Sequence, residues 1–251
     1  MPGDLSFYLF AIPAVILIGL AKGGFAGLGA LGMPLMALGV DPIAGAAILL
    51  PILIVQDVVG VAAFRKTWDG SIIAMLLPGA IVGVLLGYVL AAEVSSAAVM
   101  AVLGAVSILF GIHRLWIERG GRMVAPSNAP KWVGSLFGVA TGFTSQIAHA
   151  GGPPFQMWVM PRRLPRDVFI GTSAIFFAIL NWIKVPAYAA LGQFTKPNAL
   201  ATALLLPIAV LASLAGVKLV RKVPMERFYT IIYVLMILAG LKLLLDGAGI
   251  L

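Results

Sequence analysis

The residues of this chain most able to do chemistry lie in two glycine-rich stretches within apolar sequence. Residues 21–34 read AKGGFAGLGALGMP and contain one lysine, Lys22. Residues 142–154 read GFTSQIAHAGGPP and contain a histidine beside hydroxyl and amide side chains. A lysine cation, hydroxyls, an amide and an imidazole can all bind an anion, and glycines let a substrate approach the backbone closely. The two stretches are therefore predicted to form an anion site.

The predicted substrate-binding residues offer charge, hydrogen bonds or bare backbone. They are Lys22, Gly23, Gly24, Gly27, Gly29, Thr144, Ser145, Gln146, His149, Gly151, Gly152 and Pro153. A helix that restarts after the glycines would add free N–H groups and the positive end of its dipole. The alternatives are that Lys22 extends from a helix end to the membrane surface, that His149 is bonded to backbone in a loop, and that the glycines serve close helix packing.

A second polar set is predicted to support the site or to couple it to an ion. It consists of Gln56, Asp57, Thr172, Ser173, Asn181 and Lys184. Ionisable residues within a membrane are costly and are functional by default. We expect Lys22 to contribute to anion binding and Asp57 to carry or gate a coupling proton. The alternative is structural: Asp57 and Lys184 form a pair or bond a freed carbonyl, and Thr172 and Ser173 bond back along their own helix.

Composition places the chain among α-helical membrane proteins. Of its 251 residues, 61% are hydrophobic and only 10% are charged, against about a quarter charged in a soluble domain. The mean hydropathy is +1.08. The net charge of +8 arises from basic residues in short loops between apolar runs, which indicates membrane orientation rather than nucleic-acid binding. With no cysteine, two histidines and no tight carboxylate cluster, neither a metal nor another cofactor is expected.

The apolar sequence divides into about ten predicted membrane segments, five on each side of a polar linker. They fall near residues 5–21, 25–39, 43–64, 71–91, 95–117, 132–146, 151–161, 167–190, 198–220 and 227–246. The predicted units are a first repeat at 1–117, a cytoplasmic linker at 118–131 and a second repeat at 132–251.

The two halves of the sequence are predicted to form an internal repeat. Gly32 and Pro34 fall on Gly152 and Pro154 when the chain is shifted by 120 positions, and Leu-Leu-Pro recurs with a shift of 129. An odd number of segments per half predicts that the two repeats are inverted, with both termini outside a bacterial inner membrane. The short segments 5–21, 25–39, 132–146 and 151–161 are predicted to be broken or re-entrant helices whose tips meet near the midplane.

The two stretches resemble the sulfite exporter TauE/SafE family, also called the toluenesulfonate uptake permease family. The resemblance rests on Lys-Gly-Gly-Phe-x-Gly-x-Gly-x-x-Gly-x-Pro at 22–34, on Gly-Gly-Pro at 151–153 and on Gly-Thr-Ser at 171–173, and it covers essentially the whole chain. It implies transport of sulfur-containing anions such as sulfite, sulfonates or sulfoacetate, without fixing substrate or direction.

The sequence therefore predicts a secondary transporter of small anions with a site between the two broken motifs. A passive anion channel is one alternative, and an integral-membrane enzyme or accessory subunit is another. An enzyme is not expected, because no nucleophile–base–acid arrangement is visible. Whether the protein forms a homo-oligomer is left open.

Overall fold

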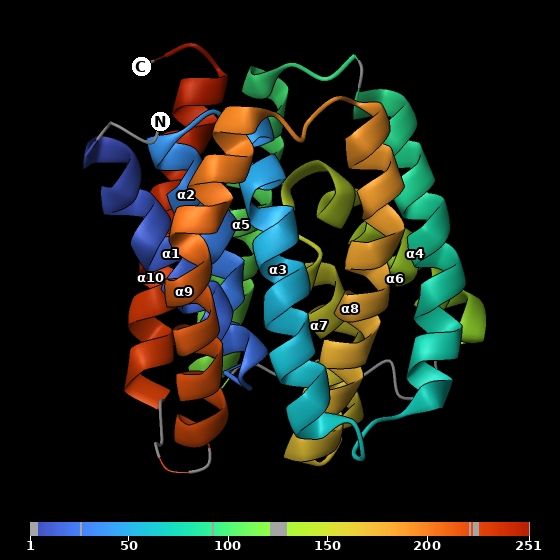
Figure 1. Ribbon diagram of the computed structural model, residues 1–251. Coiled ribbons are helices and arrows are strands. Elements are labelled where there is room, and N and C mark those ends of the chain that lie inside the picture. The colour runs from blue at the N-terminus through green and yellow to red at the C-terminus, as the bar shows by residue number, and fades with distance from the viewer. Residues whose placement is uncertain are drawn as a thin grey trace.

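The computed structural model describes residues 5–25, 27–91, 93–120, 130–220, 222 and 226–250, apart from the side chains of 118 and 226–228. Every regular element within these ranges is a helix (Figure 1). The helices are α1 (Leu5–Lys22), η1 (Leu28–Leu31), α2 (Gly32–Gly39), α3 (Pro42–Phe64), α4 (Gly70–Ala91), α5 (Ser96–Glu118), α6 (Lys131–Ala148), α7 (Gly152–Val159), η2 (Met160–Arg162), α8 (Arg166–Ala190), α9 (Lys196–Leu219) and α10 (Glu226–Gly247). The predicted all-α class is confirmed; most of the predicted linker, at 121–129, lies outside the described residues.

Seven of the described helices are long and apolar enough to cross a membrane: α1, α3, α4, α5, α8, α9 and α10. A helix of 22 residues, such as α4, rises about 33 Å, enough for a hydrocarbon core of about 30 Å. These lengths and compositions define a multi-pass membrane protein. The helices α2 and α7 have only eight residues each, which is about 12 Å of rise.

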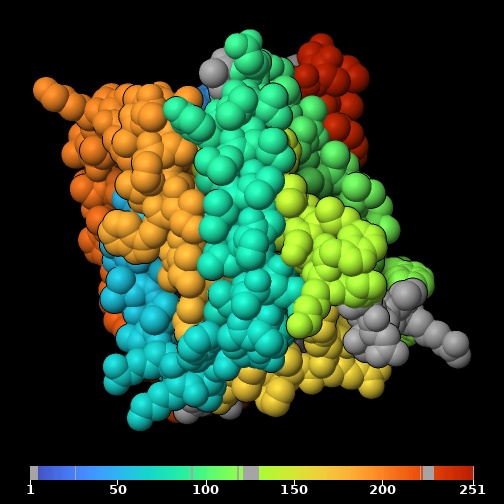
Figure 2. All heavy atoms as spheres, turned by 90° about the vertical axis from the view of Figure 1, so that its right-hand side faces the viewer, coloured from blue at the N-terminus to red at the C-terminus, as the bar shows by residue number. Residues whose placement is uncertain are grey.

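The long helices pack in pairs that are distant in sequence. α4 packs along α6, α5 along α10 and α1 along α9, while α3 lies against both α8 and α9. Figure 2 shows α4 on one face of the molecule, flanked by α6 on one side and α8 on the other. Exchanging α1–α5 with α6–α10, in order and in both directions, converts one helix pair into another. The pair α1–α9 becomes α6–α4, and α3–α9 becomes α8–α4, which are also in contact.

Both short helices follow a sharp break in the chain. After α1, Gly24 and Gly27 have positive φ angles of 126° and 102°, which L side chains rarely adopt. After α6, His149 takes the left-handed conformation at φ 49°. The next helices begin at Gly32 and Gly152, the two glycines that a shift of 120 positions superposes.

The middle of the bundle is occupied by α3, which has the largest buried share, 56%, of the seven long apolar helices. This placement decides the environment of its two polar residues. Gln56 is fully buried and Asp57 is 3% exposed. Since Asp57 cannot be hydrated at that depth, it needs partners within the protein.

Candidate functional site

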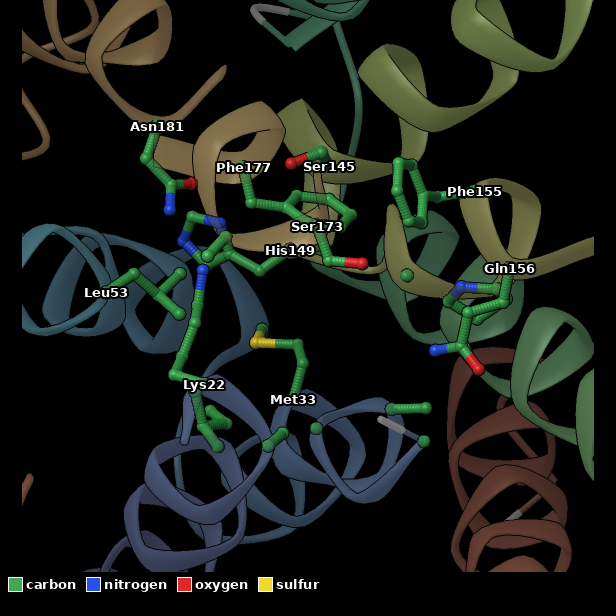
Figure 3. Close-up of a pocket in the computed structure, with 18 of the residues that line it drawn as sticks. Lys22, Met33, Leu53, Ser145, His149, Phe155, Gln156, Ser173, Phe177 and Asn181 are labelled. Carbon is green, nitrogen blue, oxygen red and sulfur yellow. The ribbon is translucent and has the colours of Figure 1, made fainter. Parts of the chain in front are cut away.

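A cavity of about 130 Å³ lies where the two broken segments approach each other (Figure 3). Its walls come from α1, the η1–α2 segment, α3, the α6–α7 break and α8. In Figure 3, Lys22 rises from α1 toward His149, with Asn181 and Ser145 beyond. The glycine-rich stretches of the two halves therefore share one cavity.

The structure separates the predicted residues into those that line this cavity and those that do not. The lining set is Lys22, Gly24, Gly27, Gly29, Ser145, His149, Gly152, Pro153, Ser173, Asn181 and Lys184. The remaining predicted residues lie outside the lining: Gly23, Gln56, Asp57, Thr144, Gln146, Gly151 and Thr172.

The predicted glycines outside the lining serve close packing. A Cβ atom added at Gly23 would lie 2.5 Å from the backbone of Gly216 on α9. One added at Gly151 would lie 2.7 Å from the carbonyl oxygen of Thr141. Both positions have room only for glycine, so here the packing alternative describes what the structure shows.

The predicted polar residues outside the lining bond mainly to backbone. Gln56 Nε2 donates to the carbonyl oxygens of Val15 and Ala209, each at 3.3 Å. Thr144 Oγ1 donates to Ala140 O at 2.7 Å.

Two further predicted residues hold connections in place. Thr172 Oγ1 donates to Val168 O at 2.7 Å and accepts from Asp69 N at 2.9 Å, which fixes the loop between α3 and α4. The carbonyl oxygen of Gln146 accepts from the hydroxyl of Tyr188 at 2.9 Å, which ties α6 to α8. Both contacts support the site from behind the cavity wall.

Asp57 supports the cavity through a buried ion pair. Lys22 Nζ donates to Asp57 Oδ1 in a short hydrogen bond, and Asn181 Nδ2 donates to Oδ2 at 2.6 Å. Lys22 also lies over the ring of Phe177, 5.4 Å from its centroid. Both carboxylate oxygens are thus occupied, while the ammonium group of Lys22, which lines the cavity, retains further hydrogens.

Lys184 and His149 form a second polar group. Lys184 is fully buried, and its Nζ lies 2.7 Å from His149 Nδ1, 3.1 Å from Ser145 Oγ and 3.2 Å from Ser145 O. The Ser145 carbonyl belongs to the last turn of α6, where the negative end of the helix dipole favours a cation. His149 Nε2 lies 2.8 Å from the carbonyl oxygen of Ala46 on α3. This group joins α3, α6 and α8 at the cavity.

The rest of the wall is apolar and was not predicted from the sequence. It includes Phe155, Phe169, Phe177, Met33 and Leu53. In a chain that is mostly apolar, nothing in the local sequence distinguishes these residues from ordinary membrane-facing ones.

One further polar residue was missed. Gln156 lines the cavity, is 8% exposed, and its Oε1 is buried without a hydrogen-bond partner among the described residues. Its position four residues after Gly152, within a short helix, was the available signal.

The electrostatics of the cavity favour an anion. Among the described lining residues, Lys22 and Lys184 are basic and none is acidic. The nearby carboxylate of Asp57 balances one of the two lysines. In the described ranges, no group of three or more His, Cys, Asp or Glu side chains is arranged to hold a metal ion. The chemistry on offer is therefore binding of a small anion by cations and hydrogen-bond donors.

A multi-pass helical protein with a cationic cavity between broken helices has the architecture expected of a membrane transporter. The sequence model of the family described as sulfite exporter TauE/SafE matches residues 11–243. The chain belongs to this family, and the resemblance inferred from the glycine-rich stretches is confirmed. No curated protein and no solved structure matches the chain.

Proposed function

We propose that the protein is a secondary transporter of small sulfur-containing anions, such as sulfite, sulfonates or sulfoacetate, in a bacterial inner membrane. The observation that carries the proposal is a cavity lined by both glycine-rich breaks, with two lysines and no acidic lining residue in the described chain. Membership of the TauE/SafE family supports the same substrate class. The alternative that the protein is an integral-membrane enzyme has no comparable support from the residues that line the cavity.

The proposal includes two inverted repeats of five segments, whose breaks meet near the membrane midplane. The exchange pattern of the helix pairs supports this arrangement. So do the equal lengths of α2 and α7 and their corresponding starts. Figure 1 shows the first turn of α1 and the last turn of α10 at the same end of the bundle, which agrees with both termini lying on one side.

In the proposed binding mode, the anion lies between Lys22 and the hydroxyls of Ser145 and Ser173. The ammonium group of Lys22 lines the cavity and uses only one hydrogen on Asp57, so its remaining hydrogens can bond the anion. The start of α7 contributes its dipole, but Pro153 and Pro154 lack backbone N–H groups, so this helix offers fewer donors than an ordinary helix start. Side chains, rather than a ring of backbone amides, therefore supply most of the proposed hydrogen bonds.

The proposal is tested by thermal melting of the purified protein with sulfite, thiosulfate, taurine, sulfoacetate and carboxylate analogues. An anion that binds only the folded state stabilises it by about 2.7 kcal/mol at a hundred times its Kd. Lys22→Gln is expected to weaken binding at least about tenfold, or 1.4 kcal/mol, because it also leaves the Asp57 carboxylate to repel the anion. Lys242→Gln, which removes an exposed lysine on α10, is the matched control.

Transport is then measured as counterflow in proteoliposomes, which also distinguishes a transporter from a passive channel. A preloaded transporter accumulates labelled anion by exchange, whereas a channel only dissipates the gradient. Failure of every anion to stabilise the protein would reject the proposed function.

Gly152→Ala tests whether the substrate approaches the start of α7. A Cβ atom at Gly152 would meet nothing closer than Gln156 Nε2 at 3.7 Å, so we expect stability to change by no more than about 0.5 kcal/mol. If the anion contacts this backbone, the added methyl group lowers its affinity about tenfold, measured as a loss of ligand-induced stabilisation. Unchanged affinity would place the anion elsewhere in the cavity.

The corresponding change at Gly24 is a poorer test. A Cβ atom there would lie 2.8 Å from Val220 Cγ2, and the φ angle of 126° is unfavourable for any other residue. A loss of transport in Gly24→Val would therefore not distinguish misfolding of the protein from blocked binding of the anion.

A further inference from the structure

The hydrogen bonds around His149 define where its protons are. A carbonyl oxygen carries no hydrogen, so the 2.8 Å contact between His149 Nε2 and Ala46 O requires Nε2 to be the donor. The other ring nitrogen, Nδ1, lies 2.7 Å from Lys184 Nζ. The ring also stacks on Tyr188, with centroids 5.8 Å apart. The orientation of the imidazole is therefore fixed by contacts on three sides.

Only one hydrogen fits between His149 Nδ1 and Lys184 Nζ. Either a neutral imidazole accepts from the lysine, or an imidazolium donates to a neutral amine. Imidazolium and ammonium together would place two donors against each other at 2.7 Å. Whichever atom holds the proton, the His149–Lys184 pair carries a charge of +1 or 0 and exchanges a single proton between those states.

The charged state of the pair has no counter-ion in the described chain. Ser145 and Ala46 supply neutral oxygen atoms. Asp57 on α3, whose charge acts on Lys184, is bonded through both oxygens to Lys22 and Asn181.

The charged and titratable groups that face the pair are Lys22 on α1, Asp57 on α3 and Tyr188 on α8. From α6 the pair meets only the neutral oxygens of Ser145. Lys22 and Asp57 cancel, so a protonated pair leaves one uncompensated positive charge in the bundle.

An uncompensated charge at full burial is strongly unfavourable. Two events remove it: an anion enters the adjoining cavity, or the proton leaves. We infer that the His149–Lys184 pair takes up one proton when a singly charged anion binds and releases it when the anion departs, so that the protein moves proton and anion together. This inference rests on the proposed function, because it requires an anion in this cavity.

The inference has a direct energetic consequence. A singly charged anion that travels with one proton carries no net charge across the membrane, so its accumulation follows the pH gradient and not the membrane potential. In this mechanism the carboxylate of Asp57 balances the charge of Lys22 and does not carry the coupling proton. The sequence-based expectation that Asp57 carries the coupling proton remains a competing prediction, which the same experiments decide.

The test measures protons directly during binding. Methanesulfonate, ethanesulfonate and isethionate are anions of strong acids, so any proton taken up on binding goes to the protein. Calorimetric titrations of the intact protein are run in buffers of different ionisation enthalpy. The slope of the observed binding enthalpy against the ionisation enthalpy of the buffer gives the number of protons bound per anion. About one proton per anion is expected where the empty pair is uncharged. In that range the affinity falls about tenfold for each unit rise in pH.

Variants assign the proton to the pair. The double variant Lys184→Met/His149→Gln, which removes both atoms able to hold the proton, is expected to reduce the count to zero. The double variant Lys22→Gln/Asp57→Asn, which keeps the charge balance of the site, is expected to leave it near one, and the exposed Lys242→Gln to match the unmodified protein. Binding without proton uptake by the unmodified protein at any pH overturns the inference and leaves the proposed function standing. Binding of none of the three sulfonates also overturns it. If sulfite and the other anions of the melting screen fail as well, the proposed function falls with it.

Discussion

Asp57→Asn is expected to destabilise the protein by about 3 kcal/mol, measured by thermal or denaturant unfolding in detergent. The carboxylate is 3% exposed and is bonded to the ammonium group of Lys22, whose side chain is 14% exposed. Removing one partner of a buried ion pair leaves the other charge uncompensated, which typically costs 3–5 kcal/mol. The asparagine keeps the shape and the contact with Asn181, so the loss reports the charge rather than a cavity.

The matched control is the double variant Lys22→Gln/Asp57→Asn. Because it removes both charges, it should recover most of the stability lost in either single variant, and the double-mutant cycle should show coupling well above 1 kcal/mol. Additive losses would mean that the two residues do not function as a pair.

The same double variant separates two hypotheses for coupling, because it removes Asp57 without changing the charge balance of the cavity. If the His149–Lys184 pair carries the proton, proteoliposomes with Lys22→Gln/Asp57→Asn still accumulate anion in response to an imposed pH gradient. If Asp57 carries it, accumulation is lost while binding persists. Transport is compared per folded molecule.

Gly142→Ala is expected to cost about 3 kcal/mol or more and to lower the amount of folded protein recovered from membranes. A Cβ atom at Gly142 would lie 2.0 Å from the carbonyl oxygen of Ala80 on α4. Since the obstacle is backbone, no rotamer change relieves it, and the helices must separate along their length. Gly79, Gly83 and Gly138 meet the facing backbone at 2.0–2.2 Å in the same way.

Gly152→Ala is the matched control for this change, because it adds the same methyl group ten positions later where the structure has room. Wild-type stability in Gly142→Ala would show that α4 and α6 do not pack as closely as described. An equivalent effect is expected at Gly216, where α9 meets the backbone of α1. The α1–α9 and α4–α6 contacts are counterparts under the proposed repeat, and both depend on glycine.

Much of the fold could be predicted from the sequence because membrane helices are marked by apolar length. The segment predicted at 43–64 is the helix Pro42–Phe64, and that at 167–190 is Arg166–Ala190. The breaks were also predictable, because glycines cluster there and each lowers helix propensity. A single proline does not end a helix in this chain, since Pro51 and Pro78 lie inside α3 and α4. The segment predicted at 25–39 is divided further, since η1 begins only at Leu28 and α2 at Gly32. These features depend on neighbours along the chain, which the sequence contains.

The sequence by itself determined that this is a helical membrane protein of the TauE/SafE family with a break in each half. Only the tertiary structure decided which residues face the cavity. Gly24 lines it while Gly23 packs on α9, and Asp57 bonds Lys22 while the adjacent Gln56 bonds the backbones of α1 and α9. The partners of these residues stand on other helices, up to 153 positions away in the chain. Which side chain meets which partner is set by how those helices rotate and pack against one another, and residue types along one segment carry no information about that rotation.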